Sequence, residues 1–115
     1  MDTAHARELL ARERARVERA LAALAAGDGE AEELADIDQH LGDAGTTTFE
    51  RERDEGIADQ LRDQLAAIER AERRVADGTY GRSVESGEPI PDARLEAIPW
   101  AERTVEEQSA FDRRV

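Results

Sequence analysis

Residues 47–77 read TTFERERDEGIADQLRDQLAAIERAERRVAD, a highly charged stretch in which the large apolar residues recur at helical spacing. Such spacing places them on one face of an amphipathic α-helix. Thr47 and Glu50 are spaced as a capping box, with Thr46 as a competing cap, and Gly78 suits the left-handed position that follows a helix. The stretch therefore predicts a helix over 47–77. Its apolar stripe consists of Phe49, Ile57, Leu61, Leu65, Ile68 and Val75.

A second apolar stripe precedes this helix. Residues 3–26 contain no Gly or Pro and are rich in Ala, Glu, Arg and Leu, which favour helix. The sequence Gly27-Asp28-Gly29 interrupts the pattern, and helical spacing resumes after it. We therefore expect a first helix over about 3–39, either continuous and bent or locally broken at the glycines. Its stripe consists of Leu10, Val17, Leu21, Leu24, Leu34 and Ile37.

The two stripes match as the facing sides of an antiparallel pair. In a helical hairpin, the residue numbers of facing partners add to a nearly constant total. Five pairs give one total to within a single residue: Ile37–Phe49, Leu24–Leu61, Leu21–Leu65, Val17–Ile68 and Leu10–Val75. This register predicts an all-α fold, in which residues 1–78 form a long antiparallel two-helix coiled-coil hairpin with its tip at about 40–46. We interpret the stripe residues as packing residues.

The composition restricts the function. The chain of 115 residues has room for one modest domain, and its net charge of −12 disfavours non-specific nucleic-acid binding. The absence of cysteine excludes disulfides, thiolate zinc sites and cysteine nucleophiles within the chain. No apolar run approaches the roughly 20 residues of a membrane span, so we expect a cytoplasmic protein with no membrane partner. The carboxylates lie on solvated helix faces, and His5 and His40 lie near a terminus and a turn. We therefore expect no enzymatic activity.

The predicted tip region is strongly acidic. No basic residue lies between Arg19 and Arg51, whereas acidic residues are frequent from Asp28 to Asp43. Charge runs of this kind are usually solvated surface, and composition alone favours that interpretation. The sharper interpretation is an acidic probe that enters a basic cavity or approaches a bound metal ion.

The segment 79–115 differs in character from the hairpin. It contains all three prolines together with the only Tyr and the only Trp of the chain. Residues 91–96 predict a short helix or turn, and Pro99 suits the first turn of a terminal helix that extends to about Phe111. A small separate core is expected from Tyr80, Ile90, Leu95, Ile98, Trp100 and Val105.

Three pieces of this segment, Tyr80-Gly81, GEPIP at 87–91 and ARLEAIP at 93–99, closely resemble the zinc-finger segment of the DksA/TraR family. That family carries two C-x-x-C pairs, and the resemblance places Ser83, Ser86, Thr104 and Glu107 at the four ligand positions. Neutral hydroxyls cannot replace thiolates around a structural zinc ion. We therefore expect no metal and no other cofactor, with a finger-like trace that either persists without zinc or is partly mobile.

The resemblance also implies a function. Members of the family bind RNA polymerase and alter transcription initiation, and their coiled coil enters the secondary channel of the enzyme with its tip directed at the active-site magnesium. In this chain the tip residues correspond to Asp43, Ala44 and Gly45, where Asp43 matches the functional aspartate and Gly45 stands in place of the family's alanine. The alternative is a divergent member that serves as a coiled-coil interaction module with another partner or with itself. Direct sequence-specific binding to nucleic acid is not expected, because no basic helix face is present.

Overall fold

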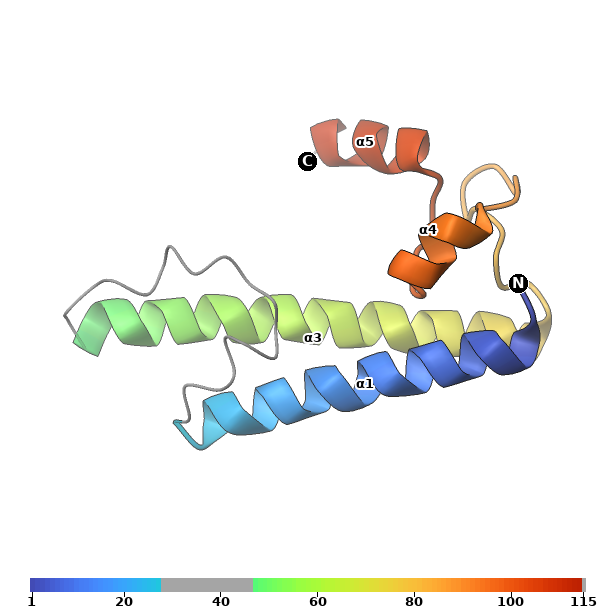
Figure 1. The fold of residues 1–115 in the computed structure, drawn as a ribbon. Coiled ribbons are helices and arrows are strands. Elements are labelled where there is room, and N and C mark those ends of the chain that lie inside the picture. Colours follow the sequence, from blue (N-terminus) through green and yellow to red (C-terminus); the bar gives the residue numbers. More distant parts are fainter. Residues whose placement is uncertain (28–46, 115) are drawn as a thin grey trace. The chain divides into compact units, whose positions relative to one another are not determined.

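The computed structural model describes residues 1–27 and 47–114, with residues 47–49 described by their backbone alone. Within these ranges the chain forms four helices (Figure 1): α1 (Thr3–Ala25), α3 (Thr47–Asp77), α4 (Asp92–Ala97) and α5 (Val105–Arg114). Extended pairing among the described residues is limited to an isolated antiparallel bridge between Arg82 and Pro89. The predicted all-α fold, with a long antiparallel helix pair and a smaller C-terminal segment, is confirmed.

The chain divides into two compact units, of which one is formed by Arg12–Ala66 and contains parts of both long helices. These parts run side by side in opposite directions (Figure 1). Val17 and Ala20 of α1 are completely buried, and Ile57 and Leu61 of α3 are at most 2% exposed. Apolar burial along one face of each helix therefore holds this unit together, as the stripes predict.

The other unit combines Met1–Ala11 with Ala67–Val115. Here the first turns of α1 pack against the last turns of α3, where Leu10 and Ile68 are almost completely buried. Leu10 and Val75 line the same surface hollow, as expected for a facing pair.

Alanine occupies buried positions on both long helices that the two stripes omit. Its small side chain lets neighbouring helices approach closely, since the distance between helix axes depends on the side chains at the contact. The hairpin thus obtains a packed interface from a composition that is poor in large apolar residues. The buried alanines of the long helices are Ala6, Ala20, Ala67 and Ala71.

Glycine marks the end of both long helices. Gly78 follows α3 with φ +79°, and the N–H of Thr79 donates a 2.9 Å hydrogen bond to the Arg74 carbonyl, which gives a Schellman-type end. Gly27 has φ +76°, and α1 ends before it at Ala25. The remainder of the expected first helix to residue 39, the Ile37–Phe49 pair and the tip lie outside the described residues.

The C-terminal segment has its own small core of Ile90, Leu95 and Ala101. Met1, Tyr80 and Ile98 pack against it, and the Tyr80 hydroxyl donates a 2.8 Å hydrogen bond to the Pro99 carbonyl. Burial raises the pKa of Tyr80 to about 12, because the phenolate would lose solvation that the neighbouring Arg74 charge only partly replaces.

Two expectations about this segment are wrong. Val105 is 55% exposed rather than part of the small core. The terminal helix begins at Val105 rather than at Pro99, because residues 101–104 form a non-helical connection that ends in the cap of α5. The short helix expected at 91–96 is present as α4.

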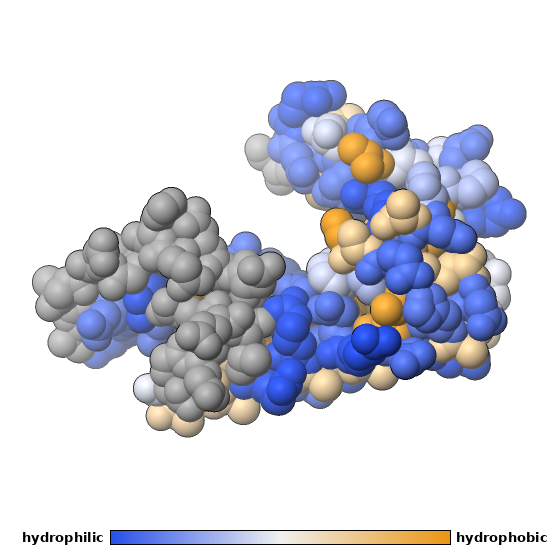
Figure 2. Space-filling model, in the orientation of Figure 1, coloured by the Kyte–Doolittle hydropathy of each residue, from blue (hydrophilic) through white to orange (hydrophobic). Residues whose placement is uncertain are grey.

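On the face shown in Figure 2, the described residues are mostly hydrophilic, with small hydrophobic patches. The large apolar side chains with the greatest exposure in this part of the chain are Val84, Val105 and Phe111, all in the C-terminal segment. None of the helices described has the length and apolarity needed to cross a membrane.

Candidate functional site

A tight loop connects α3 to α4 and places Ser83 at its centre. The Ser83 N–H donates to the Glu88 carbonyl at 2.8 Å, and the Gly87 N–H donates to the Ser83 carbonyl at 3.0 Å. Gly81 and Gly87 adopt φ values of +88° and +77°, which favour glycine because they lie in the left-handed region. These backbone bonds hold residues 83–88 as a compact turn.

The side chains of Ser83 and Ser86 stabilise this turn from within. Ser83 is 5% exposed, and its Oγ accepts hydrogen bonds from the Glu85 N–H at 3.0 Å and the Ser86 N–H at 3.2 Å. The Ser86 Oγ in turn accepts a 3.2 Å bond from the Glu88 N–H. Both hydroxyls therefore serve as acceptors for the turn and keep one proton each to donate elsewhere.

Thr104 and Glu107 form a reciprocal cap at the start of α5. The Thr104 N–H donates to Glu107 Oε1 at 2.9 Å, and the Glu107 N–H donates to Thr104 Oγ1 at 3.2 Å. This is the capping-box arrangement, in which two helix-terminal N–H groups are satisfied by two side chains. It explains locally why α5 begins at Val105.

The structure brings together the four residues that the resemblance places at zinc-ligand positions. The pKa of Glu107 is lowered to about 2, first by hydrogen bonding from the Ser86 hydroxyl, then by the Thr104 backbone N–H and the Ser83 hydroxyl. Hydrogen bonds that stabilise the charged form of a carboxyl group lower its pKa in this way. The turn at 83–86 also contacts the connection that leads into α5, where the Val84 N–H donates to the Glu102 carbonyl at 2.9 Å and Arg103 pairs with Glu85.

This group of side chains does not fit a structural zinc ion. Three of its members are neutral hydroxyls, and the lone pairs of Ser83 already accept two backbone N–H groups. Structural zinc sites use four thiolate or imidazole ligands, and a single carboxylate cannot replace them. No group of three or more His, Cys, Asp or Glu suited to a metal ion is present among the described residues.

A second carboxylate attaches the connection between α4 and α5 to α3. Glu102 accepts hydrogen bonds from Arg70 Nε at 2.8 Å and Arg70 Nη2 at 3.1 Å, and from Arg74 Nη1 at 3.2 Å. The pKa of Glu102 is lowered mainly by the hydrogen bond from Arg70, against the opposing effect of burial. Glu102 was not predicted as a site residue from the sequence. The signal that could have indicated such a partner is the spacing of Arg70 and Arg74, which places two guanidinium groups on one helix face.

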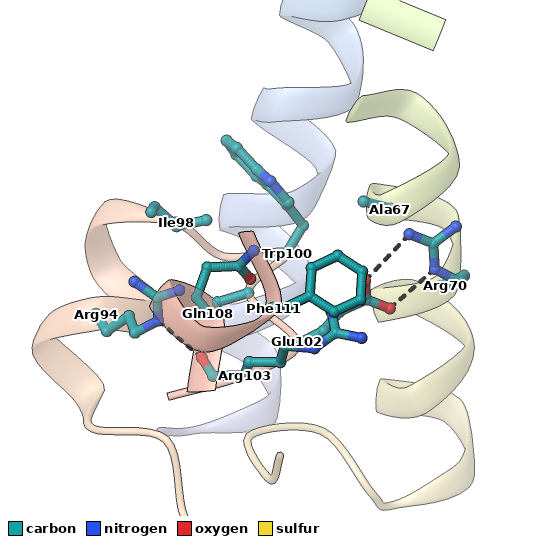
Figure 3. A pocket seen from close by; sticks show the side chains of 10 residues that line it. Ala67, Arg70, Arg94, Ile98, Trp100, Glu102, Arg103, Gln108 and Phe111 are labelled. Carbon is teal, nitrogen blue, oxygen red and sulfur yellow. Dashed lines mark hydrogen bonds and ion pairs between the residues drawn. The ribbon is translucent and has the colours of Figure 1, made fainter. Parts of the chain in front are cut away.

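Glu102 also lines a hollow of about 570 Å³ that is shared by the half-buried Trp100 and the exposed Phe111 (Figure 3). Trp100 and Phe111 contribute to its wall, and the Arg103 guanidinium lies 3.9 Å from the centre of the Phe111 ring. The lining residues include no pair of nucleophile and general base. The hollow therefore brings aromatic and charged side chains together on one surface.

The predicted tip residues Asp43, Ala44 and Gly45 lie outside the described residues. Of the predicted site residues, the structure thus places Ser83, Ser86, Thr104 and Glu107 in one cluster, whereas the position of the tip relative to that cluster stays a matter of prediction.

Comparison with known families supports the resemblance. A family model described as "Prokaryotic dksA/traR C4-type zinc finger" matches residues 78–113, which include all four cluster residues. The structure is also similar to that of transcription factor DksA2 from Pseudomonas aeruginosa, with a TM-score of 0.66 and 28% sequence identity over 97% of this chain and 84% of that chain.

Curated bacterial proteins match part of the chain more closely. General stress protein 16O of Bacillus subtilis is 40% identical over 73 residues, which cover 64% of this chain and 45% of that protein. The RNA polymerase-binding transcription factor DksA of Caulobacter vibrioides is 42% identical over 74 residues, which cover 64% of this chain and 52% of that protein. The matched stretch therefore spans about half the length of these relatives.

Proposed function

The chain belongs to the DksA/TraR family, and from this premise we propose that it binds RNA polymerase and regulates transcription. The observation that carries the proposal is the similarity to DksA2, because it extends over 97% of this chain and so includes the helix pair as well as the finger-like segment. The similarity to a relative named for its binding to RNA polymerase supports the same partner.

In this proposal the helix pair enters the secondary channel of the polymerase with its acidic tip directed at the active site. The 31 residues of α3 correspond to about 46 Å of helix at 1.5 Å per residue, and an elongated helix is the kind of element that such a probe requires. Asp43 would act through its charge on the bound metal ion or nucleotide, with Ala44 and Gly45 beside it. The role requires binding and electrostatics, and we assign no catalytic residue.

The test uses the full chain and purified RNA polymerase from the same source. Wild type, Asp43→Asn and the matched control Asp28→Asn, which lies in the same acidic stretch, are compared for co-purification with polymerase and for their effect on transcription initiation in vitro. We expect all three to bind, and only Asp43→Asn to lose its effect on initiation. Both assays are read at several salt concentrations, since charge-dependent contacts weaken with ionic strength.

Each failure has a distinct meaning. If wild type does not bind polymerase, the proposed partner is wrong, and recovery of the chain in another specific complex or as a self-associated form would favour an interaction module instead. If wild type binds and Asp43→Asn affects initiation as wild type does, polymerase binding stands and the tip mechanism is wrong.

A further inference from the structure

We propose that the Glu107 carboxylate takes the place of a metal ion in this finger, because it joins the turn at 83–86 to the start of α5 through Ser83, Ser86 and Thr104. The proposal concerns how the segment is held together, and it does not depend on the identity of the protein's partner.

The hydrogen-bonding capacity of Ser83 gives the first argument. A serine hydroxyl has one proton to donate and two lone pairs to accept with. The Glu85 and Ser86 N–H groups occupy its accepting side, so the proton of this 5% exposed side chain needs an acceptor. The turn that carries Ser83 and Ser86 lies beside the start of α5, because the Val84 N–H donates to the Glu102 carbonyl at 2.9 Å and Arg103 pairs with Glu85. The Glu107 carboxylate accepts from the Thr104 N–H at this junction, and the lowering of its pKa by both serine hydroxyls agrees with its serving as their acceptor.

The spacing of the four residues gives the second argument. Ser83 and Ser86 are three residues apart, as are Thr104 and Glu107, and this is the spacing of each C-x-x-C pair in a zinc finger. It is also the spacing of a capping box, in which the third helical residue reaches back to the cap. One backbone geometry therefore suits either a pair of zinc ligands or the Thr104–Glu107 cap that the structure contains.

The charge of the group gives the third argument. A carboxylate offers about four acceptor sites on two oxygens, enough for two hydroxyl protons and one backbone N–H. Its negative charge also lies at the first turn of α5, where the exposed N–H groups favour an anion. A zinc ion would instead face hydroxyl oxygens that are already engaged as acceptors. The four residues that stand in place of the cysteine ligands thus form a consistent set, in which hydrogen-bond donors surround one acceptor, the Glu107 carboxylate.

Other contacts span the same two pieces of chain and make the proposal testable without unfolding the protein. The Val84 N–H donates to the Glu102 carbonyl at 2.9 Å, and Arg103 forms a short ion pair with Glu85. These bonds remain when Glu107 is replaced, so the loss of the carboxylate should loosen the junction locally rather than abolish the fold.

The first test measures amide hydrogen exchange by NMR in Glu107→Ala, with Glu106→Ala as the matched control. Glu106 lies in the same helical turn but is exposed. We expect exchange at the Glu85, Ser86 and Glu107 amides to accelerate roughly threefold to tenfold in Glu107→Ala, the factor that corresponds to the net loss of an ordinary hydrogen bond. Glu107→Gln should recover part of the protection, because its amide oxygen can still accept.

The proposal is overturned if the Glu85, Ser86 and Glu107 amides exchange at equal rates in Glu107→Ala and Glu106→Ala, since the carboxylate would then not hold the turn at 83–86 to the start of α5. A change confined to α5, with the Glu85 and Ser86 amides unaffected, would also overturn it and would leave Glu107 as a helix cap only. A double-mutant cycle between Ser86→Ala and Glu107→Ala checks the contact directly, and the effects of the two changes should not be additive.

The second test reverses the replacement. A variant with Ser83→Cys, Ser86→Cys, Thr104→Cys and Glu107→Cys should bind one zinc ion per chain, as measured by native mass spectrometry under reducing conditions, and wild type should bind none. Cobalt substitution should give the absorption of a tetrahedral thiolate site. Failure of this variant to bind zinc while its helices remain folded would show that the four positions do not converge as a ligand set, and stoichiometric zinc in wild type would refute the metal-free junction.

Discussion

Replacing Leu95 by alanine should unfold the C-terminal segment and leave the long helices formed. Leu95 is 1% exposed, and it is one of only two large side chains buried in a core cluster whose third member is Ala101. A Leu→Ala change in a core costs about 2–5 kcal/mol, which includes the cavity that it leaves. At about 0.05–0.15 kcal/mol per residue, a segment of this size has a total stability of roughly 2–6 kcal/mol. The cost of the substitution is therefore comparable to the whole stability of the segment.

The chain has built-in reporters for this experiment. Its only Tyr and its only Trp, Tyr80 and Trp100, both lie in the C-terminal segment, so near-ultraviolet circular dichroism and intrinsic fluorescence report on that segment. Far-ultraviolet circular dichroism is dominated by the 23 residues of α1 and the 31 residues of α3, against 6 and 10 residues in α4 and α5. In Leu95→Ala we expect the near-ultraviolet signal at 25 °C to be lost and most of the helical signal to remain.

Leu95→Met is the matched control, because exchange for a side chain of similar volume costs less than about 1.5 kcal/mol and should preserve both signals. The reasoning fails if Leu95→Ala keeps its near-ultraviolet signal and its melting temperature, since the cluster would then contribute little. It fails equally if both signals disappear in one transition, because the segment and the helix pair would then be a single cooperative unit.

Three further predictions concern individual side chains. Titration of the single tyrosine by absorbance should give a midpoint near 12 for Tyr80 in the folded chain and about 10 in urea. The stability due to the neutral phenol is therefore fully present below pH 10 and is lost as the pH rises toward 12. A folded midpoint near 10 would contradict the burial of this phenol. Glu102→Gln should lower the free energy of unfolding, measured in urea, by about 1–2 kcal/mol, because the bidentate contact with Arg70 loses its charge. An unchanged midpoint of urea unfolding would show that the ion pair contributes nothing to stability. Gly78→Ala should cost about 1 kcal/mol in thermal unfolding, since Gly78 has φ +79°, whereas a stabilised variant would exclude strain at the end of α3.

The helix pair could be predicted from the sequence because its signals are local and redundant. The sequence of the second helix has capping-box spacing at Thr47 and Glu50, a stripe of regular period and a glycine at Gly78, and the observed helix Thr47–Asp77 agrees with these signals. The buried alanines were not predicted, because hydropathy alone does not distinguish an alanine at a helix contact from one on the surface. Their burial depends on how closely the helices approach, which is a property of the pair.

The C-terminal segment was less predictable for a different reason. Its contacts join residues far apart in sequence, such as Glu102 with Arg70, and no local pattern specifies them. The pair Thr104 and Glu107 carried a local signal that was available, since T-x-x-E followed by a helix is the pattern of a capping box. The preference of proline for the first helical turn was followed instead, and it placed the start of the terminal helix too early, at Pro99.

A structural zinc ion contributes about 10–16 kcal/mol to the folding of small zinc-finger peptides, far more than any one hydrogen bond or ion pair described here. In the metal-free state proposed above, the finger must therefore obtain its stability from several modest terms that act on the same few residues. Three such terms are present: the cluster around Leu95, the attachment of Glu102 to the arginines of α3, and the junction around Glu107. Because only four residues separate Glu102 from Glu107, the contacts of each carboxylate reduce the conformational entropy that the contacts of the other must offset. It follows that the removal of either carboxylate should weaken the contacts of the other. A metal ion bound by four ligands would fix both pieces of chain by itself, so the contacts of Glu102 and Glu107 would not need to depend on each other.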